Sequence, residues 1–323
     1  MNPDVEERTQ EFLKHLDDGH MVEADDWMPD AYRAELVRLI RLHAVSEIMG
    51  TLPEKEWVPR APTLYRKLAL MAKVQDEAGH GQLLIRVAED LMAPEGENRE
   101  HIMEDLFAGR QKFHNVFHLP VPTWADAGLI GWLVDGAAII TQGMLLGGSY
   151  APYTRALRRI VEEEAFHIQH GESICMALAE GTAGQRAMFQ DALTRWWPAL
   201  MMFFGPPEGG VAPAAGAGTT HASHQAANLR FRIRSKSNEE LRQRYLSKYV
   251  PRIRSLGFVI PDPTLQQDPE TKVWTYQPPD WQQWRAIITN HGPRSAARLT
   301  LRRTSYAEGQ WVRDVMAATR KAV

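Results

Sequence analysis

Two segments of the sequence place a histidine three residues after a glutamate: Glu77-Ala-Gly-His80 and Glu164-Ala-Phe-His167. With 24 glutamates and 12 histidines in 323 residues, about one such pair is expected by chance, so either pair alone means little. On a helix, residues three apart share a face, and each pair then offers a carboxylate and an imidazole to one point in space. Together the two pairs indicate a metal site.

Each pair is preceded by a further carboxylate at nearly the same spacing. Glu47 lies 30 residues before Glu77, and Asp135 lies 29 residues before Glu164. A glutamate from each of two helices, with Glu-x-x-His from two others, is the ligand set of di-iron and di-manganese carboxylate bundles. Asp135 is one methylene shorter than glutamate, so its helix must lie closer or its carboxylate must bind differently. Four carboxylates and two imidazoles suit iron or manganese.

The surroundings of Asp135 support this interpretation. The residue lies in the segment 129–140, where apolar residues occupy every side of a helix. An unpaired carboxylate there would cost several kcal/mol or be forced to take up a proton. A metal cation removes that cost, and so would a buried arginine or lysine. The residues alone leave both alternatives open.

The elements that must position these residues are helical. Apolar residues recur at helical spacing in four long stretches, and every candidate ligand falls within one of them: 31–50, 62–92, 123–147 and 153–179. Further helices are predicted over 98–111, 184–204 (interrupted at Pro198), 238–255 and 294–322, with a small hairpin from 257–261 and 272–276. The predicted fold is all-α, a ferritin-like four-helix bundle with a mostly helical, partly irregular C-terminal extension.

Composition shifts divide the chain into four expected parts. Residues 1–25 form a polar N-terminal arm, and 26–204 form the di-iron bundle. Residues 205–237, rich in Gly, Pro and Ala and then in Arg, form a flexible loop and basic segment. Residues 238–323 form an extension that packs on the bundle.

Charge and cysteine content exclude several classes of protein. The net charge is −3 without a basic tail, which argues against a nucleic-acid partner. The single cysteine, Cys175, excludes a disulfide framework, a thiolate zinc site and a cysteine-ligated iron–sulfur cluster within this chain. Residues 1–18 lack the features of a signal peptide, and the longest apolar run, 127–140, is shorter than the ~20 residues of a membrane span. A soluble cytoplasmic protein without a membrane partner is expected.

Other polar residues near the candidate ligands are less informative. His43 and His170 each lie one helical turn from a candidate ligand, and each is interpreted as either a supporting residue or a bystander. Glu162 and Glu163, beside Glu164, are expected to form an ordinary solvent-exposed helix face.

At this point the sequence resembles a known family, the catalytic alpha subunits of bacterial multicomponent ring 1,2-phenylacetyl-CoA epoxidases, which are di-iron monooxygenases of aerobic phenylacetate degradation. The matching segments cover nearly the whole chain: Asp26-Trp-Met-Pro-Asp-Ala-Tyr-Arg33, Arg60-Ala-Pro-Thr-Leu64, Ala72-Lys-Val-Gln-Asp-Glu-Ala-Gly-His-Gly81, Gly131-Trp-Leu-Val-Asp-Gly-Ala-Ala138, Trp197-Pro-Ala-Leu-Met-Met202, Glu240-Leu-Arg-Gln-Arg244 and Gly309-Gln-Trp-Val-Arg313. The family also has an aspartate at the position of Asp135, so that departure is expected.

The resemblance implies a specific reaction. Two irons would be ligated by six residues: Glu47, Glu77, His80, Asp135, Glu164 and His167. Reduced iron would bind O₂, the co-substrate; one oxygen atom would add across the ring of phenylacetyl-CoA, and the other would leave as water. The sequence has neither a Gly-x-Gly-x-x-Gly motif nor cluster cysteines, so electrons are expected from another protein.

The resemblance also implies partners. In the family a separate reductase carries the NADPH, FAD and iron–sulfur chemistry. Two further partners are expected, a small accessory subunit and a structural ferritin-like sister subunit with a decayed metal site. Coenzyme A needs cations near the mouth of the substrate channel, and four residues are predicted to contact it, each with a solvated surface role as the alternative: Arg38, Lys73, Arg234 and Asn238.

Two other functions stay open. One is a different di-iron oxygenase that acts on another acyl- or aryl-CoA. The other is a non-catalytic iron-binding protein, such as a ferritin-like partner subunit. The complete ligand set argues against the partner subunit, and the long C-terminal extension argues against a simple storage shell.

Overall fold

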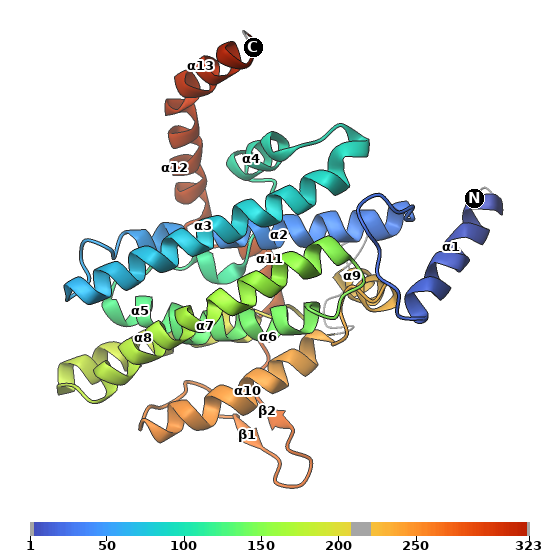
Figure 1. Ribbon diagram of the computed structural model, residues 1–323. Helices are drawn as coiled ribbons and strands as arrows, with labels where there is room; N and C mark the ends of the chain where they lie inside the picture. Colours follow the sequence, from blue (N-terminus) through green and yellow to red (C-terminus); the bar gives the residue numbers. More distant parts are fainter. Residues whose placement is uncertain (1–2, 208–220, 322–323) are drawn as a thin grey trace.

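Four long helical stretches form the centre of the molecule in a computed structural model that describes residues 3–207 and 221–321 (Figure 1). They are α2 (Asp30–Lys55), α3 (Leu64–Met92), the stretch Trp124–Leu145, and α7 (Ala151–Ala179). Around them lie eight further α-helices of the described chain: α1 (Pro3–Asp17), α4 (Arg99–Ala108), α8 (Ala183–Met202), α9 (His221–Arg230), α10 (Asn238–Ser255), α11 (Trp281–Ile288), α12 (Ser295–Glu308) and α13 (Gln310–Lys321). The all-α prediction is confirmed.

Helices α2 and α3 pack closely along their length because a glycine lies between them. A Cβ atom at Gly81 would lie 2.5 Å from Ile48 Cγ1 and 3.0 Å from the Ala44 carbonyl oxygen. Any larger residue would therefore push the helices apart. Helix α3 begins at the N-cap Thr63, whose hydroxyl accepts a hydrogen bond from the Arg66 amide at 3.2 Å. This close packing brings Glu47 of α2 near Glu77 of α3.

The third stretch is not a uniform α-helix. It consists of α5 (Trp124–Leu129), a single π-helical turn labelled η3 (Ile130–Val134), and α6 (Asp135–Leu145). The sequence predicted an uninterrupted helix here. A π turn changes the rotational register of the residues after it, and such turns are frequent at functional sites. The first of those residues is Asp135.

The π turn touches α7 through glycine. A Cβ atom at Gly171 would lie 2.2 Å from the Gly131 carbonyl carbon, which is too close for any side chain. Only glycine lets the two backbones meet, and this contact sets the distance between the helices that carry Asp135 and Glu164.

The same stretch is the one described helix that is long and apolar enough to cross a membrane by length and composition, but 72% of its most apolar window is buried within the protein. Its apolar side chains belong to a large core cluster that also includes residues of α2, α3 and α7. This burial is that of a core helix.

Several element boundaries differ from the predictions. The described part of the polar arm contains α1, whose Phe12 and Leu16 enter the core. Helix α2 continues through Pro53, and Pro198 does not interrupt α8. The hairpin pairs β1 (Gln266–Gln267) with β2 (Trp274–Thr275), so only its second strand was predicted. Two short 3₁₀ turns are also present, η1 (Ala93–Glu95) and η2 (Asn115–His118). Residues 208–220 of the predicted loop lie outside the described residues.

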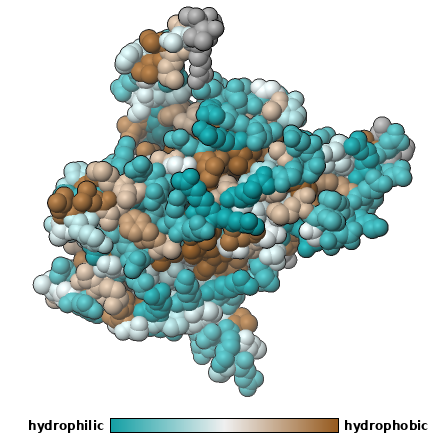
Figure 2. Space-filling view, in the orientation of Figure 1, coloured by the Kyte–Doolittle hydropathy of each residue, from teal (hydrophilic) through white to brown (hydrophobic). Residues whose placement is uncertain are grey.

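The C-terminal extension is packed unevenly: α10 enters the main core cluster, whereas α12 and α13 are largely exposed. Helices α12 and α13 stand away from the body of the molecule (Figure 1). Helix α12 contacts α4, where Tyr306 stacks on Phe107 at 4.4 Å between ring centroids. Figure 2 shows that apolar surface reaches solvent on the start of α3, where the exposed large residues are Leu64, Tyr65, Leu68 and Met71.

Candidate metal centre

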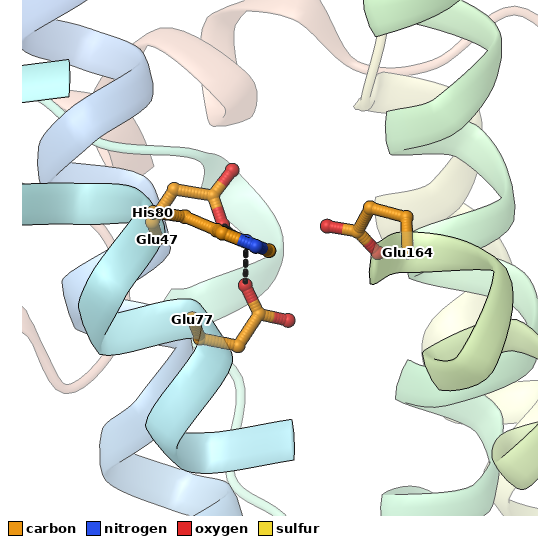
Figure 3. A group of neighbouring side chains, drawn as sticks. All are labelled: Glu47, Glu77, His80 and Glu164. Atoms are coloured by element: carbon orange, nitrogen blue, oxygen red, sulfur yellow. Dashed lines mark ion pairs between the residues drawn. The ribbon is translucent and has the colours of Figure 1, made fainter. Parts of the chain in front are cut away.

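All six predicted ligands meet between the four long helices. Their side-chain donor atoms form two overlapping groups, and within each group all atoms lie within 4.8 Å of one another. One group, drawn in Figure 3, contains Glu47, Glu77, His80 and Glu164. The other contains Glu77, Asp135, Glu164 and His167. Since Glu77 and Glu164 belong to both groups, the geometry suits two adjacent cations that share two carboxylates.

Two buried atoms in this cluster support a metal site. His80 Nδ1 and Asp135 Oδ2 have no hydrogen-bond partner among the described residues, although charged groups lie near both: Asp135 Oδ2 is 3.1 Å from Lys73 Nζ, and His80 Nδ1 is 3.7 Å from the carboxylates of Glu47 and Glu77. His167 Nδ1 faces the same space, 3.2 Å from Glu164 Oε2 and 3.4 Å from Glu77 Oε1. Buried polar atoms are normally paired, and a bound cation would satisfy these. Oxygen and imidazole donors together suit iron or manganese.

The Nε2 atoms of His80 and His167 each contact a carboxylate from the helix that carries the other histidine. His80 Nε2 lies 2.7 Å from Glu163 Oε2, and His167 Nε2 lies 3.3 Å from Asp76 Oδ2. Glu163 comes directly before Glu164, and Asp76 directly before Glu77, so each Glu-x-x-His segment supports the histidine of the other. Such carboxylates fix the orientation of ligating histidines.

The prediction for Glu163 as a plain surface residue is therefore wrong. Its carboxylate accepts from a buried histidine because α3 and α7 lie side by side. The signal in the sequence was an acidic residue immediately before each ligand glutamate, as in Asp76-Glu77 and Glu163-Glu164.

Lys73 lies inside the centre rather than at a channel mouth. Its Nζ is 2.6 Å from Glu54 Oε2, 3.1 Å from Glu77 Oε1 and 3.1 Å from Asp135 Oδ2. The side chain is 1% exposed, so it cannot meet a phosphate of coenzyme A, and the structure corrects that prediction. Asp135 thus faces both a buried lysine and the cluster of metal donors, which combines the two alternatives that the sequence left open.

Glu54 is a member of the cluster that the sequence pattern did not reveal. It lies seven residues after Glu47, two helical turns along the same face of α2, and it is 1% exposed. Burial raises its pKa to about 7, although the Lys73 ammonium acts in the opposite direction.

Burial and crowding change the acidity of the candidate ligand carboxylates. Burial, with the nearby Glu77 charge, raises the pKa of Glu47 to about 8. Burial also raises the pKa of Asp135 to about 7, with Lys73 opposing and Glu164 adding to the shift. Burial also disfavours the charged form of Glu77, but the Lys73 ammonium holds the pKa of that carboxyl well below its usual range. A cluster that retains protons without metal would exchange them for cations.

His43 supports Glu47 and is not a bystander. Its Nε2 lies 2.7 Å from Glu47 Oε1, and its Nδ1 lies 2.8 Å from the Tyr153 hydroxyl. Burial lowers the pKa of His43 to about 4, so the ring is neutral at pH 7. His170 instead stacks on Phe166.

A small cavity of about 80 Å³ adjoins the centre. Four ligand carboxylates form one part of its wall, and the rest is largely apolar, including Leu39, Leu42, Phe117, Val134, Ala138, Leu145 and Phe203. A cavity of ~150 Å³ accommodates benzene, so an aromatic ring would enter this one only if lining side chains move.

A larger cavity of about 960 Å³ lies next to the small one, and Leu42 lines both. Its wall is rich in basic residues: Arg33, Arg38, Arg41, Arg110, Lys112 and Arg285. Arg38 is therefore placed where a phosphate could reach it. Arg234 and Asn238 line neither of these cavities; Arg234 donates to Asn238 Oδ1 at 2.8 Å, and Asn238 donates to the Pro206 carbonyl at 2.9 Å.

Comparison with known proteins assigns the chain to a family. The family model described as "Phenylacetic acid catabolic protein" matches residues 9–311. Among characterised proteins, the chain is similar to one of the subunits of the 1,2-phenylacetyl-CoA epoxidase of Escherichia coli (strain K12). The two are 45% identical over 313 residues, which cover 96% of each chain.

Proposed function

This chain belongs to the phenylacetic acid catabolic protein family, and on that premise we propose that it is the catalytic subunit of a multicomponent monooxygenase that epoxidises the ring of phenylacetyl-CoA. The observation that carries the proposal is the pair of overlapping donor groups, with Glu77 and Glu164 in both, beside an apolar cavity. The similar E. coli protein bears the name of such an epoxidase.

Two irons would be held by the six clustered residues: Glu47, Glu77, His80, Asp135, Glu164 and His167. When bound, the irons supply the activation of O₂, a reaction that no side chain performs unaided. The protein's own part is to hold the donors in place. Glu163 and Asp76 orient the two histidines, and His43 orients Glu47.

The two adjoining cavities match the two ends of an aryl-CoA in chemical character, and the smaller one would have to widen to take the ring. The small apolar cavity would take the phenyl ring and exclude water from the reacting atoms, and the large basic cavity would take the nucleotide phosphates. In the structure Arg38 Nη2 lies 2.8 Å from Glu35 Oε2, and a phosphate would compete with Glu35 for it. Lys112 and Arg285 line the same cavity and would add to the attraction.

Electrons would come from a separate NADPH-dependent reductase, because the sequence offers no dinucleotide motif and no cluster cysteines. The E. coli relative is named as one subunit of its epoxidase, which denotes a protein that works with other subunits. We propose that this chain likewise works in the cytoplasm with a small accessory subunit and with a ferritin-like sister subunit.

The decisive experiment co-expresses the chain with its partner subunits, measures iron per chain, and supplies reductase, NADPH, phenylacetyl-CoA and ¹⁸O₂. About two irons per chain and one labelled oxygen atom in the CoA product are expected. Iron-loaded protein that oxygenates another aryl- or acyl-CoA but not phenylacetyl-CoA would contradict the substrate assignment. Iron without any oxygenation would contradict a catalytic role.

The phosphate assignment has its own test. Arg38→Gln should raise the KM for phenylacetyl-CoA about tenfold, the usual effect of losing one charge-assisted hydrogen bond. Arg158→Gln, on the exposed surface of α7, is the matched control and should leave the KM unchanged. Equal effects of the two substitutions would contradict a specific role for Arg38.

A further inference from the structure

Gln142 has a buried acceptor atom without a partner. The side chain lies on α6, is 2% exposed, and lines the small cavity beside the metal centre. Its Nε2 lies 3.5 Å from His43 Nε2, whereas its Oε1 has no hydrogen-bond partner among the described residues. A buried amide oxygen left unpaired is costly, so a ligand that carries an N–H group at this point would be favoured.

We propose that Gln142 Oε1 accepts a hydrogen bond from the amide N–H nearest the thioester in the pantetheine arm of an acyl-CoA. This contact sets how deeply the acyl group enters the small cavity. The inference rests on the proposed function and adds a positioning residue to it.

The spacing along α6 agrees with the length of this part of the substrate. Gln142 follows Asp135 by seven residues, which is two helical turns on nearly the same face and about 10 Å along the axis. Six bonds separate the attachment carbon of the phenyl ring from the amide nitrogen, a span of about 8 Å when extended. With the amide at Gln142, the ring lies beside the metal ligand Asp135.

Gln142 also lies close to the part of α2 that the two cavities share. Its Nε2 is 3.5 Å from His43 Nε2, and Leu42, the residue before His43, lines both cavities. An arm that runs from the basic cavity to the metals therefore passes the level of Gln142. The thioester and its amide are the polar part of that arm, which suits a single polar group in a mostly apolar wall.

The test compares two truncated ligands by calorimetric binding to the full chain, prepared with its partner subunits. One is the N-acetylcysteamine thioester of phenylacetate, which keeps the amide N–H. The other is an alkyl thioester of the same length without the amide. The wild type is expected to bind the first about tenfold more tightly, as one hydrogen bond to a buried acceptor warrants.

Two variants identify the residue responsible. Gln142→Met keeps the side-chain length but removes the amide, and it should abolish the preference and raise the KM for phenylacetyl-CoA about tenfold with iron content unchanged. Thr141→Val is the matched control, because the Thr141 hydroxyl lines the same cavity but bonds the Ala137 carbonyl at 3.2 Å. It should keep the preference.

The outcomes separate this inference from the proposed function. A wild type that oxygenates phenylacetyl-CoA but binds both thioesters equally would overturn the role of Gln142 and leave the function standing. The same conclusion follows if Gln142→Met keeps the preference. A wild type that prefers the amide ligand but never oxygenates phenylacetyl-CoA would support the thioester site and overturn the proposed function.

Discussion

Asp126 and Asp135 lie nine residues apart on one helical stretch, and both are buried, but their surroundings are opposite. Asp126 accepts from the Thr123 amide and hydroxyl at 2.8 and 2.6 Å, from Arg195 at 2.7 Å, and from Trp196 Nε1 at 2.8 Å. Asp135 Oδ2 has no hydrogen-bond partner among the described residues, and its one ion pair, with Lys73 Nζ at 3.1 Å, is shared with Glu54 and Glu77. Burial alone therefore does not distinguish a structural carboxylate from a functional one.

The hydrogen-bond partners of a buried acid distinguish the two roles. Asp126 stabilises the start of α5 through a capping box and ties it to α8, so all its hydrogen-bonding capacity serves the fold. Asp135 shares a donor group with the carboxylates of Glu77 and Glu164 and with His167, and Lys73 is the lysine that faces it. Satisfied acceptors indicate structure, and clustered unsatisfied acceptors indicate a site for a cation.

The largest expected effect comes from Asp135→Ala. Iron should fall clearly below two per chain and product formation should fall to background, because one metal loses a ligand. The free energy of unfolding of the metal-free variant at pH 8 should stay within about 1 kcal/mol of the wild type, since burial disfavours ionised Asp135 in the fold. Metal analysis measures the iron content, and urea denaturation measures the free energy of unfolding. Strong destabilisation of the metal-free variant would show that Asp135, like Asp126, serves mainly to stabilise the fold.

Asp126→Ala should produce the reverse pattern. It removes a helix cap and leaves Trp196 Nε1 and Arg195 without their acceptor, so the free energy of unfolding should fall by about 3 kcal/mol. Protein that remains folded should bind as much iron as the wild type. Loss of iron at unchanged stability, in the same two assays, would break the contrast between the two aspartates.

The cluster of six candidate ligands could be predicted because its signal is local. Helical spacing places Glu77 with His80 and Glu164 with His167, and an apolar run makes Asp135 conspicuous. The family resemblance assigned the same six residues, and the structure brings them together. The all-α fold followed from the same periodicity.

The rest depends on contacts between helices that no local pattern encodes. Lys73 lies four residues before Glu77, which is compatible with an exposed or a buried side chain, and packing against α2 and α6 decides in favour of burial. Glu163 is partly exposed, and only the approach of α3 reveals its partner His80. The π turn before Asp135 was not predictable, because the glycine contact that accompanies it is formed in three dimensions.

Glu163→Gln extends the comparison to a carboxylate that contacts a candidate ligand, His80, and is not itself a candidate ligand. The amide can still contact His80 Nε2, but it no longer offers a charged acceptor, so the histidine is held less firmly. Iron affinity or activity should fall about 10- to 100-fold, the usual cost of altering such a partner. Glu162→Gln, on the exposed face of the same helix, is the control and should have no effect on either quantity. If the two variants behave equally in a chelator competition assay, Glu163 belongs to an ordinary solvent-exposed helix face, as the sequence predicted.

The smallest expected effect is a pH dependence of the metal-free protein between pH 7 and 9. The folded-state pKa values of Glu47 and Asp135 are raised to about 8 and about 7, so in this window the fold retains protons that the unfolded chain has lost. Burial opposes the charged form of His80, but the nearby carboxylates of Glu47 and Glu77 outweigh it and raise the pKa of His80 to about 10. This shift lowers stability at rising pH in the same way. The free energy of unfolding should therefore decrease as pH rises, by about 1.4 kcal/mol per pH unit for each proton that the fold retains. Asp135→Ala should flatten this slope at the low end of the window, near pH 7, where Asp135 still holds part of its proton. Asp126→Ala should lower stability equally at every pH in the window. Bound cations replace the protons, so iron-loaded protein should show a shallower slope in the same denaturation series, and a slope unchanged by both Asp135→Ala and iron would mean that other groups control it.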